Sequence, residues 1–106
     1  MSTEGKTIIR AAFDVAATAV TVVASVPLKR IFIVGLEFTV NTAGTTFKLT
    51  EHGVSDLHAA QTFALGGGKT MINFDYVLYS TTTKGTALDI TTTIGKATGS
   101  IWYYIE

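Results

Sequence analysis

The sequence contains no cysteine, so disulfide bridges and thiolate metal ligands are both excluded. Charge is also scarce: only 15% of the residues are charged, and eight basic side chains balance eight acidic ones. A chain without a basic block lacks the electrostatic feature that supplies most nucleic-acid affinity. We therefore expect no nucleic-acid partner, and a core that apolar packing alone must hold together.

Long apolar runs are missing as well. The apolar segments are too interrupted to cross a bilayer, and residues 1–6 lack the basic start and continuous apolar stretch of a signal peptide. We expect no membrane partner and a product made and kept soluble in a cytoplasm.

What the chain does have is enough apolar residues for one core. A length of 106 residues with 47% apolar side chains fits a single folded domain and argues against disorder. We predict one domain over residues 1–106, in which residues 1–25 form an arm or an edge-strand segment.

A single proline, scattered glycines and many β-branched residues favour strands along most of the chain. Leu36, Phe38 and Val40 alternate with polar residues, which is typical of a strand with one face buried. The stretch 31–34 is apolar on both faces, so we expect it to be covered twice. A turn at residues 41–44 then predicts a β-hairpin that returns through Phe47.

Counted together, such segments predict about eight short strands in an all-β, antiparallel sandwich of the jelly-roll type. The alanine-rich stretch 15–23 leaves a brief helix open, but its valines and threonines favour a strand. A further strand is expected over residues 71–76. The predicted core consists of Phe32, Phe38, Phe47, Leu49, Phe74, Leu88, Ile90 and Tyr103.

One glycine-rich stretch resembles part of a nucleotide site. Residues 66–70 read Gly-Gly-Gly-Lys-Thr, like the end of a phosphate-binding P-loop. That motif needs a glycine where Phe63 stands and a helix after Thr70, whereas a strand is predicted there. We interpret the stretch as a glycine hairpin or bulge.

Three other groupings contain residue types that carry chemistry. His52, Asp56 and His58 lie in one polar loop without a further histidine or cysteine, which favours a solvated loop over a metal site. Ser55 lies beside them, but no nucleophile motif surrounds it. Asp75 and Asp89 occupy polar phases of predicted strands, so we expect both to face solvent. We therefore predict no catalytic residue, no cofactor, no metal and no enzyme activity.

The last strand places large aromatic side chains on both of its faces, and only one face can point into the core. The other face is covered by the N-terminal segment, left partly exposed, buried at a subunit contact, or used to stack a carbohydrate. We predict an oligomer or capsid interface formed by Ile31, Ile33, Trp102 and Tyr104.

Several short motifs together carry a family resemblance. They are Leu28-Lys29-Arg30-Ile31 through Thr46-Phe47-Lys48-Leu49, Gly66-Gly67-Gly68, Gly85-Thr86-Ala87-Leu88-Asp89-Ile90 and Gly99-Ser100-Ile101-Trp102-Tyr103-Tyr104. In these the chain resembles small β-sandwich proteins of tailed bacteriophage particles, although it lacks the proline-rich N-terminal arm of the better-known decoration proteins.

The resemblance implies a structural part of a virion. It implies a capsid decoration (cement) protein that binds the major capsid protein on the outside of the assembled head, commonly as a homotrimer. The alternative is a carbohydrate- or receptor-binding module of a tail or head fibre.

Overall fold

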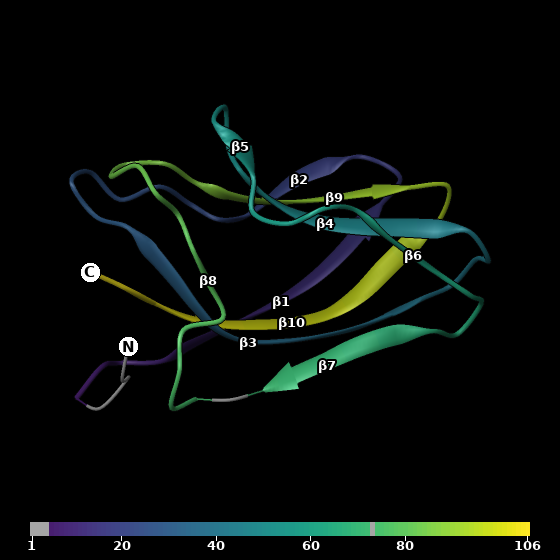
Figure 1. The fold of residues 1–106 in the computed structure, drawn as a ribbon, viewed down its shortest axis with the longest axis horizontal. Coiled ribbons are helices and arrows are strands. Elements are labelled where there is room, and N and C mark those ends of the chain that lie inside the picture. Colours follow the sequence, from purple (N-terminus) through teal and green to yellow (C-terminus); the bar gives the residue numbers. More distant parts are fainter. Residues whose placement is uncertain (1–4, 73) are drawn as a thin grey trace.

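The computed structural model describes residues 5–72 and 74–106, and all regular structure in them is β-strand. No described segment forms a helix that is long and apolar enough to span a membrane. The strands lie in two layers (Figure 1). Their bounds are β1 Ile9–Ala16, β2 Ala19–Val23, β3 Ile31–Val40, β4 Thr45–Glu51, β5 Ser55–Asp56, β6 Gln61–Phe63, β7 Gly68–Ile72, β8 Tyr79–Ser80, β9 Leu88–Thr93 and β10 Lys96–Ile105.

Each layer is an antiparallel sheet. Sheet I has the order β1-β10-β3-β7, with β8 also on β3, and sheet II has the order β2-β9-β4-β5, with β6 also on β4. Because short strands share the positions beside β3 and β4, the ten strands fill eight positions. The chain alternates between the sheets at most connections, as in a jelly roll. This confirms the predicted antiparallel sandwich.

The alternation corrects one local prediction. The turn at residues 41–44 forms, but it carries the chain from β3 in sheet I to β4 in sheet II instead of closing a hairpin. Both strands bury their alternate apolar residues, and these residues meet across the two sheets. Phe38 of β3 and Phe47 of β4 stack with ring centroids 3.8 Å apart.

The core lies between the sheets, where period-two alternation placed it. The predicted core residues Phe38, Phe47, Leu49, Leu88 and Ile90 are all buried there. Tyr103 is only half-buried but packs against the same cluster.

A second apolar cluster covers part of the outer face of sheet I. Phe32, Val34 and Tyr104 are buried there, and Ile8, Val77 and Trp102 pack against them. The apolar stretch 31–34 is therefore covered on both faces, as predicted. Phe32 is buried, but in this outer cluster and not between the sheets.

The strand expected over residues 71–76 is wrong. β7 ends at Ile72, Asn73 lies outside the described residues, and Phe74 and Tyr76 are exposed in the connection to β8. Phe74 is not a core residue, because its ring lies on the outer face of sheet I against Trp102. Gly35 makes room for this contact, since a Cβ there would lie 3.1 Å from the Trp102 ring and 3.3 Å from that of Phe74.

The first part of the chain contributes the edge strands of both sheets. The helix left open for residues 15–23 does not form: β1 ends at Ala16 and β2 begins at Ala19. Between them Ala17 adopts a left-handed backbone with φ of 45°. β1 and β2 each lie at the edge of their sheet.

The β9–β10 turn holds an isoleucine in a left-handed backbone conformation. Ile94 has φ of 72°, and the N–H of Gly95 donates to the carbonyl of Thr93 at 2.9 Å, which closes a γ-turn. A β-branched residue is disfavoured in this region, and such γ-turns are strained. The Ile94 side chain gains little burial in return, since 67% of it is exposed.

We expect Ile94→Gly to stabilise the protein by about 1 kcal/mol, because glycine adopts this conformation without steric cost. Urea denaturation measures the change. Leu65→Gly is the matched control: Leu65 is also exposed in a turn but has no left-handed backbone, so there glycine only adds unfolded-state entropy. Equal destabilisation by both changes would contradict the strain at Ile94.

Candidate functional site

A hollow surface lies on the outer face of sheet I. Two adjoining hollows of about 310 and 550 Å³ share Glu37, Thr98 and Gly99. Together they are lined by Arg10, Ala12, Phe13, Asp14, Glu37, Phe38, Thr39, Thr70, Thr98, Gly99 and Ser100. We call this surface the sheet-face groove.

Small and polar residues make the groove. In the register of sheet I, Glu37 of β3 pairs with Thr70 of β7 and Ser100 of β10, and Ser100 pairs with Ala12 of β1. The carboxylate of Glu37 makes no hydrogen bond or ion pair with another described residue. The groove therefore offers hydroxyl groups and one free carboxylate, a surface suited to binding and not to proton transfer between converging groups.

At one end of the groove, the lining residue Arg10 lies beside a pair of aromatic rings. The Arg10 guanidinium lies 5.9 Å from the centre of the Trp102 ring, a cation–π distance. Phe74 meets Trp102 edge-on, with ring centroids 5.9 Å apart. Trp102 is half-buried as a result and Phe74 is exposed.

The other end of the groove carries an ion pair on the outer face of β1 and β10. Lys96 lies 3.1 Å from one carboxylate oxygen of Asp14, and the Thr98 hydroxyl donates to the other at 3.0 Å. Hydrogen bonds from Lys96 and then Thr98 lower the pKa of Asp14. Asp14 is therefore a carboxylate at neutral pH.

The four residues predicted for a subunit or capsid interface are not a shared surface. Ile31 and Ile33 lie in the core between the sheets, and Tyr104 is buried in the outer cluster. Only Trp102 keeps part of its surface exposed. The apolar side chains of β3 that point away from the core are those of Phe32 and Val34, and the chain's own outer cluster buries them.

Of the readings offered for the aromatic strand, coverage by the N-terminal segment describes Tyr104. Ile8 packs against its cluster, and the Lys6 ammonium lies 5.7 Å from the centre of its ring. Burial, and secondarily the charge of Glu106, raise the pKa of the Tyr104 hydroxyl.

His52 is held by a carboxylate from β9. Its Nδ1 lies 2.6 Å from one oxygen of Asp89, and the Thr21 hydroxyl donates to the other oxygen at 2.7 Å. Asp89 is thus buried, which corrects the expectation that it faces solvent, whereas Asp75 is exposed as expected. The arrangement resembles the acid and base of a hydrolase triad, but no described hydroxyl bonds to His52.

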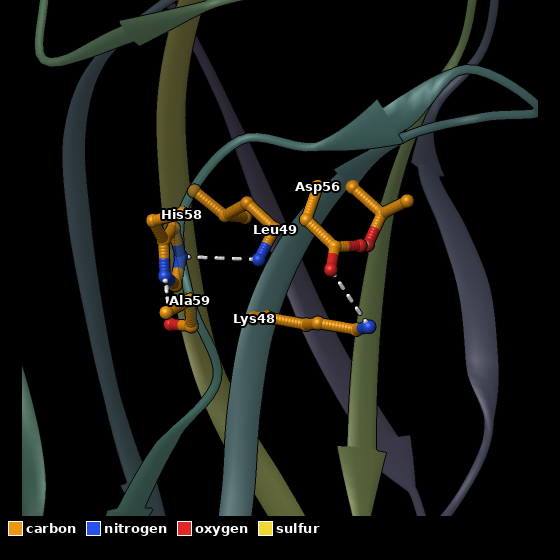
Figure 2. Close-up of polar contacts among 6 residues, drawn as sticks. Lys48, Leu49, Asp56, His58 and Ala59 are labelled. Atoms are coloured by element: carbon orange, nitrogen blue, oxygen red, sulfur yellow. Dashed lines mark hydrogen bonds and ion pairs between the residues drawn. The ribbon is translucent and has the colours of Figure 1, made fainter.

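The loop around His58 is not a metal site. No group of three or more metal-binding side chains converges among the described residues. Figure 2 shows His58 turned toward β4, where its Nε2 accepts a hydrogen bond of 3.1 Å from the Leu49 N–H. Its Nδ1 lies 2.8 Å from the carbonyl of Ala59. Because Nε2 must accept, Nδ1 is the donor, and His58 fastens the loop as a neutral imidazole.

Asp56 works in a similar way on β5. It pairs with Lys48 at 3.1 Å and accepts from the Thr50 hydroxyl at 3.3 Å (Figure 2). Ser55, on the same short strand, is exposed and takes no part in either cluster. These groups hold β5 against β4.

The glycine-rich stretch 66–70 is neither a phosphate loop nor a hairpin. It carries the chain from β6 in sheet II to β7 in sheet I, and Gly66 adopts φ of 74° in the turn. The Gly67 carbonyl accepts from the Val40 N–H at 2.8 Å, which ties the turn to the end of β3.

The strongest polar centre was missed by the sequence reasoning. Glu51, at the end of β4, is fully buried. Its oxygens accept hydrogen bonds of 2.8 to 3.0 Å from the N–H groups of Thr82 and Thr83 and the hydroxyls of Thr82 and Thr86. Burial would raise the pKa of Glu51, but these bonds together lower it. The run of three threonines before a Lys-Gly turn was the available signal.

Comparisons with known proteins assign no family. No family model matches the sequence, and no curated protein matches it. Among solved structures, the chain is similar to a protein of Bacillus endospore appendages, which are described as a novel family of disulfide-linked pili. The two share 19% identity over 99% of this chain and 91% of that chain, with a TM-score of 0.50. At that identity the likeness shows a common β-sandwich fold and nothing further.

Proposed function

We propose that the chain is a non-enzymatic structural subunit that acts by binding other protein subunits, and that its setting is the outside of an assembled phage head. The observation that carries the proposal is the exposure of large apolar side chains at loop tips. Leu65, exposed by 70%, belongs to the β6–β7 connection, and Ile94, exposed by 67%, belongs to the β9–β10 turn. These two connections lie at the same end of the sandwich (Figure 1). Leu28, exposed by 80%, belongs to the β2–β3 connection, which lies at the opposite end (Figure 1). Exposed apolar side chains mark contact sites when they gather on one surface, so the end that carries both Leu65 and Ile94 is the candidate contact.

The polar side chains that could carry chemistry support a structural role, because they are used to hold the fold together. His52, Asp56 and His58 each bond to neighbouring strands, and the Glu51 carboxylate fastens a loop. Side chains used in this way make a rigid body with fixed loops. A rigid body that binds only an assembled shell raises the stability of that shell by mass action.

Two other settings use other features of the surface. A carbohydrate- or receptor-binding module of a fibre would use the sheet-face groove, which offers hydroxyl groups and whose lining residue Arg10 lies against the ring of Trp102. The third candidate role is that of a pilus subunit, because the structurally similar Bacillus protein comes from endospore appendages that are described as pili. That assembly is described as disulfide-linked, and this chain has no cysteine, so any polymer of it would be held without disulfides.

Antibody labelling distinguishes these settings. An antibody raised against the purified chain is applied to particles and surfaces of cells that carry the gene, and labels are located by electron microscopy. We expect label on assembled heads. Label on tail or head fibres supports the receptor-binding module instead, and label on cell- or spore-surface filaments supports a pilus subunit. Label on none of them, with the chain free in the lysate, overturns the proposal of an assembly subunit.

A further inference from the structure

The open edge of sheet I lies along β1. Its eight residues pair with β10 on one side, and no other described strand pairs with it. Edge strands of this length are normally blocked by proline, a bulge or a covering segment. β1 contains no proline, and its register with β10 runs without a shift from Ile9 to Ala16. β1 is therefore a regular template for a further strand.

The register shows which backbone groups face that open edge. The N–H of Ala17 donates to the carbonyl of Gly95, and these residues continue the β1–β10 register. Antiparallel strands alternate between residues that bond to the partner and residues that face away. Odd-numbered residues of β1 thus bond to β10, and the N–H and C=O groups of Arg10, Ala12 and Asp14 point outward. The side chains of these three residues are exposed.

Two opposite charges are placed symmetrically on this edge. Arg10 and Asp14 stand two residues before and two residues after Ala12, on the outer face of sheet I. If a second β1 pairs antiparallel with the first about a two-fold axis at Ala12, Arg10 of each copy faces Asp14 of the other. Opposite charges directly across an antiparallel pair stabilise it, and like charges destabilise it.

We propose that two copies of this chain associate through β1, antiparallel and centred on Ala12, to join their sheets I into one continuous sheet. The proposal rests on the assembly role proposed above and names one contact of it. The outward groups of Arg10, Ala12 and Asp14 supply the backbone hydrogen bonds. On the inner face the same register sets Ile9 opposite Val15 and Ala11 opposite Phe13, so apolar residues meet apolar residues.

Neighbouring registers lack this match. Centring on Ala11 places Arg10 opposite Ala12, and centring on Phe13 places Asp14 opposite Ala12, so neither register sets Arg10 opposite Asp14. A shift to a centre between residues would set outer-face side chains against inner-face ones. The contact closes after two copies, because a two-fold pairing uses the same edge of both.

The register is tested by charge variants and their mixture. In an Arg10→Asp dimer, both of the 10–14 pairs between the copies consist of two aspartates. In an Asp14→Arg dimer, both pairs consist of two arginines. Each variant alone is expected to weaken dimerisation about tenfold or more. A one-to-one mixture restores both opposite-charge pairs, so we expect it to form a heterodimer about as strong as the wild-type dimer.

Sedimentation at up to about 100 µM suits a small contact of this kind. We expect the wild type to reach twice the chain mass of 11.3 kDa and the mixture to do the same. Ala12→Pro is an independent variant: it removes outward N–H donors without touching the bonds to β10, and we expect a folded monomer. Circular dichroism checks that each variant retains its strands.

The outcomes separate cleanly. A wild type that stays at 11.3 kDa, or that has the mass of three chains, overturns the two-fold contact. A dimer that persists in Ala12→Pro, or folded charge variants whose mixture stays monomeric, overturns β1 or its register. Antibody label on assembled heads alongside any of these results leaves the proposed function standing, so the two proposals fail separately.

Discussion

Replacing Glu51 with alanine is expected to lower the free energy of unfolding by about 3 kcal/mol or more. The carboxylate is fully buried, and its four hydrogen bonds hold the loop between β8 and β9 onto the end of β4. Alanine removes the acceptor of the N–H groups of Thr82 and Thr83 and releases this otherwise exposed loop from the end of β4. Urea denaturation of the two proteins measures the loss.

Glutamine is expected to be almost as harmful, for a geometric reason. One oxygen of Glu51 accepts the N–H of Thr82 and the other accepts the N–H of Thr83. Whichever way the amide is flipped, its NH₂ group meets a backbone N–H that cannot reverse its role. We expect Glu51→Gln to cost about 2 kcal/mol. Glu37→Ala is the matched control, because that carboxylate has no described partner, and its expected change is below about 0.5 kcal/mol.

The effect of Glu51 depends on pH in a defined direction. The pKa of Glu51 in the folded protein lies below the usual glutamate value of 4.5, so its contribution is fully present above that pH. It is lost as the pH falls below 4.5 through the folded pKa. The stability gap between wild type and Glu51→Gln should therefore shrink in acid. A gap that stays constant down to pH 2 would contradict an ionised Glu51.

The fold was predictable because its signal is local. Alternation along β3 and β4 marks which residues face the core, and that requires only a strand with one buried side. The partners of these strands were not predictable: a turn of the same sequence closes a hairpin or crosses to another sheet. Phe74 shows the same limit, since its place follows from Gly35, which is distant in the sequence and leaves room for its ring.

The candidate surfaces depended even more on tertiary structure. Ile31 and Phe32 are equally apolar neighbours, and only the second sheet and the covering segments decide which cluster each joins. Asp89 was expected to face solvent from the polar phase of a strand, and Glu51 was not singled out, although it follows Phe47 and Leu49 in the buried phase of β4. Residues from other parts of the chain bury both carboxylates. The composition of a strand does not reveal which distant residues will pack against it.

Gly99→Ala is expected to destabilise the protein by more than about 3 kcal/mol. Gly99 lies in β10, between Phe13 of β1 and Phe38 of β3. A Cβ at this position would lie 1.9 Å from the carbonyl oxygen of Glu37, which is backbone and cannot rotate away. The equilibrium urea midpoint and slope measure the change.

Two further glycines separate the clash from other costs of adding a side chain. Gly53→Ala has nothing within 4 Å of the new Cβ and meets only the left-handed backbone penalty of φ 72°, about 1 to 2 kcal/mol. Gly68→Ala places its Cβ 1.9 Å from the carbonyl oxygen of Phe38, but β7 is an edge strand and can shift outward. We expect the cost to fall in the order Gly99, Gly68, Gly53, because β10 is held on both sides by β1 and β3. A Gly99→Ala protein as stable as Gly53→Ala would contradict this order. It would show that β10 can move within sheet I and relieve the clash with the Glu37 carbonyl.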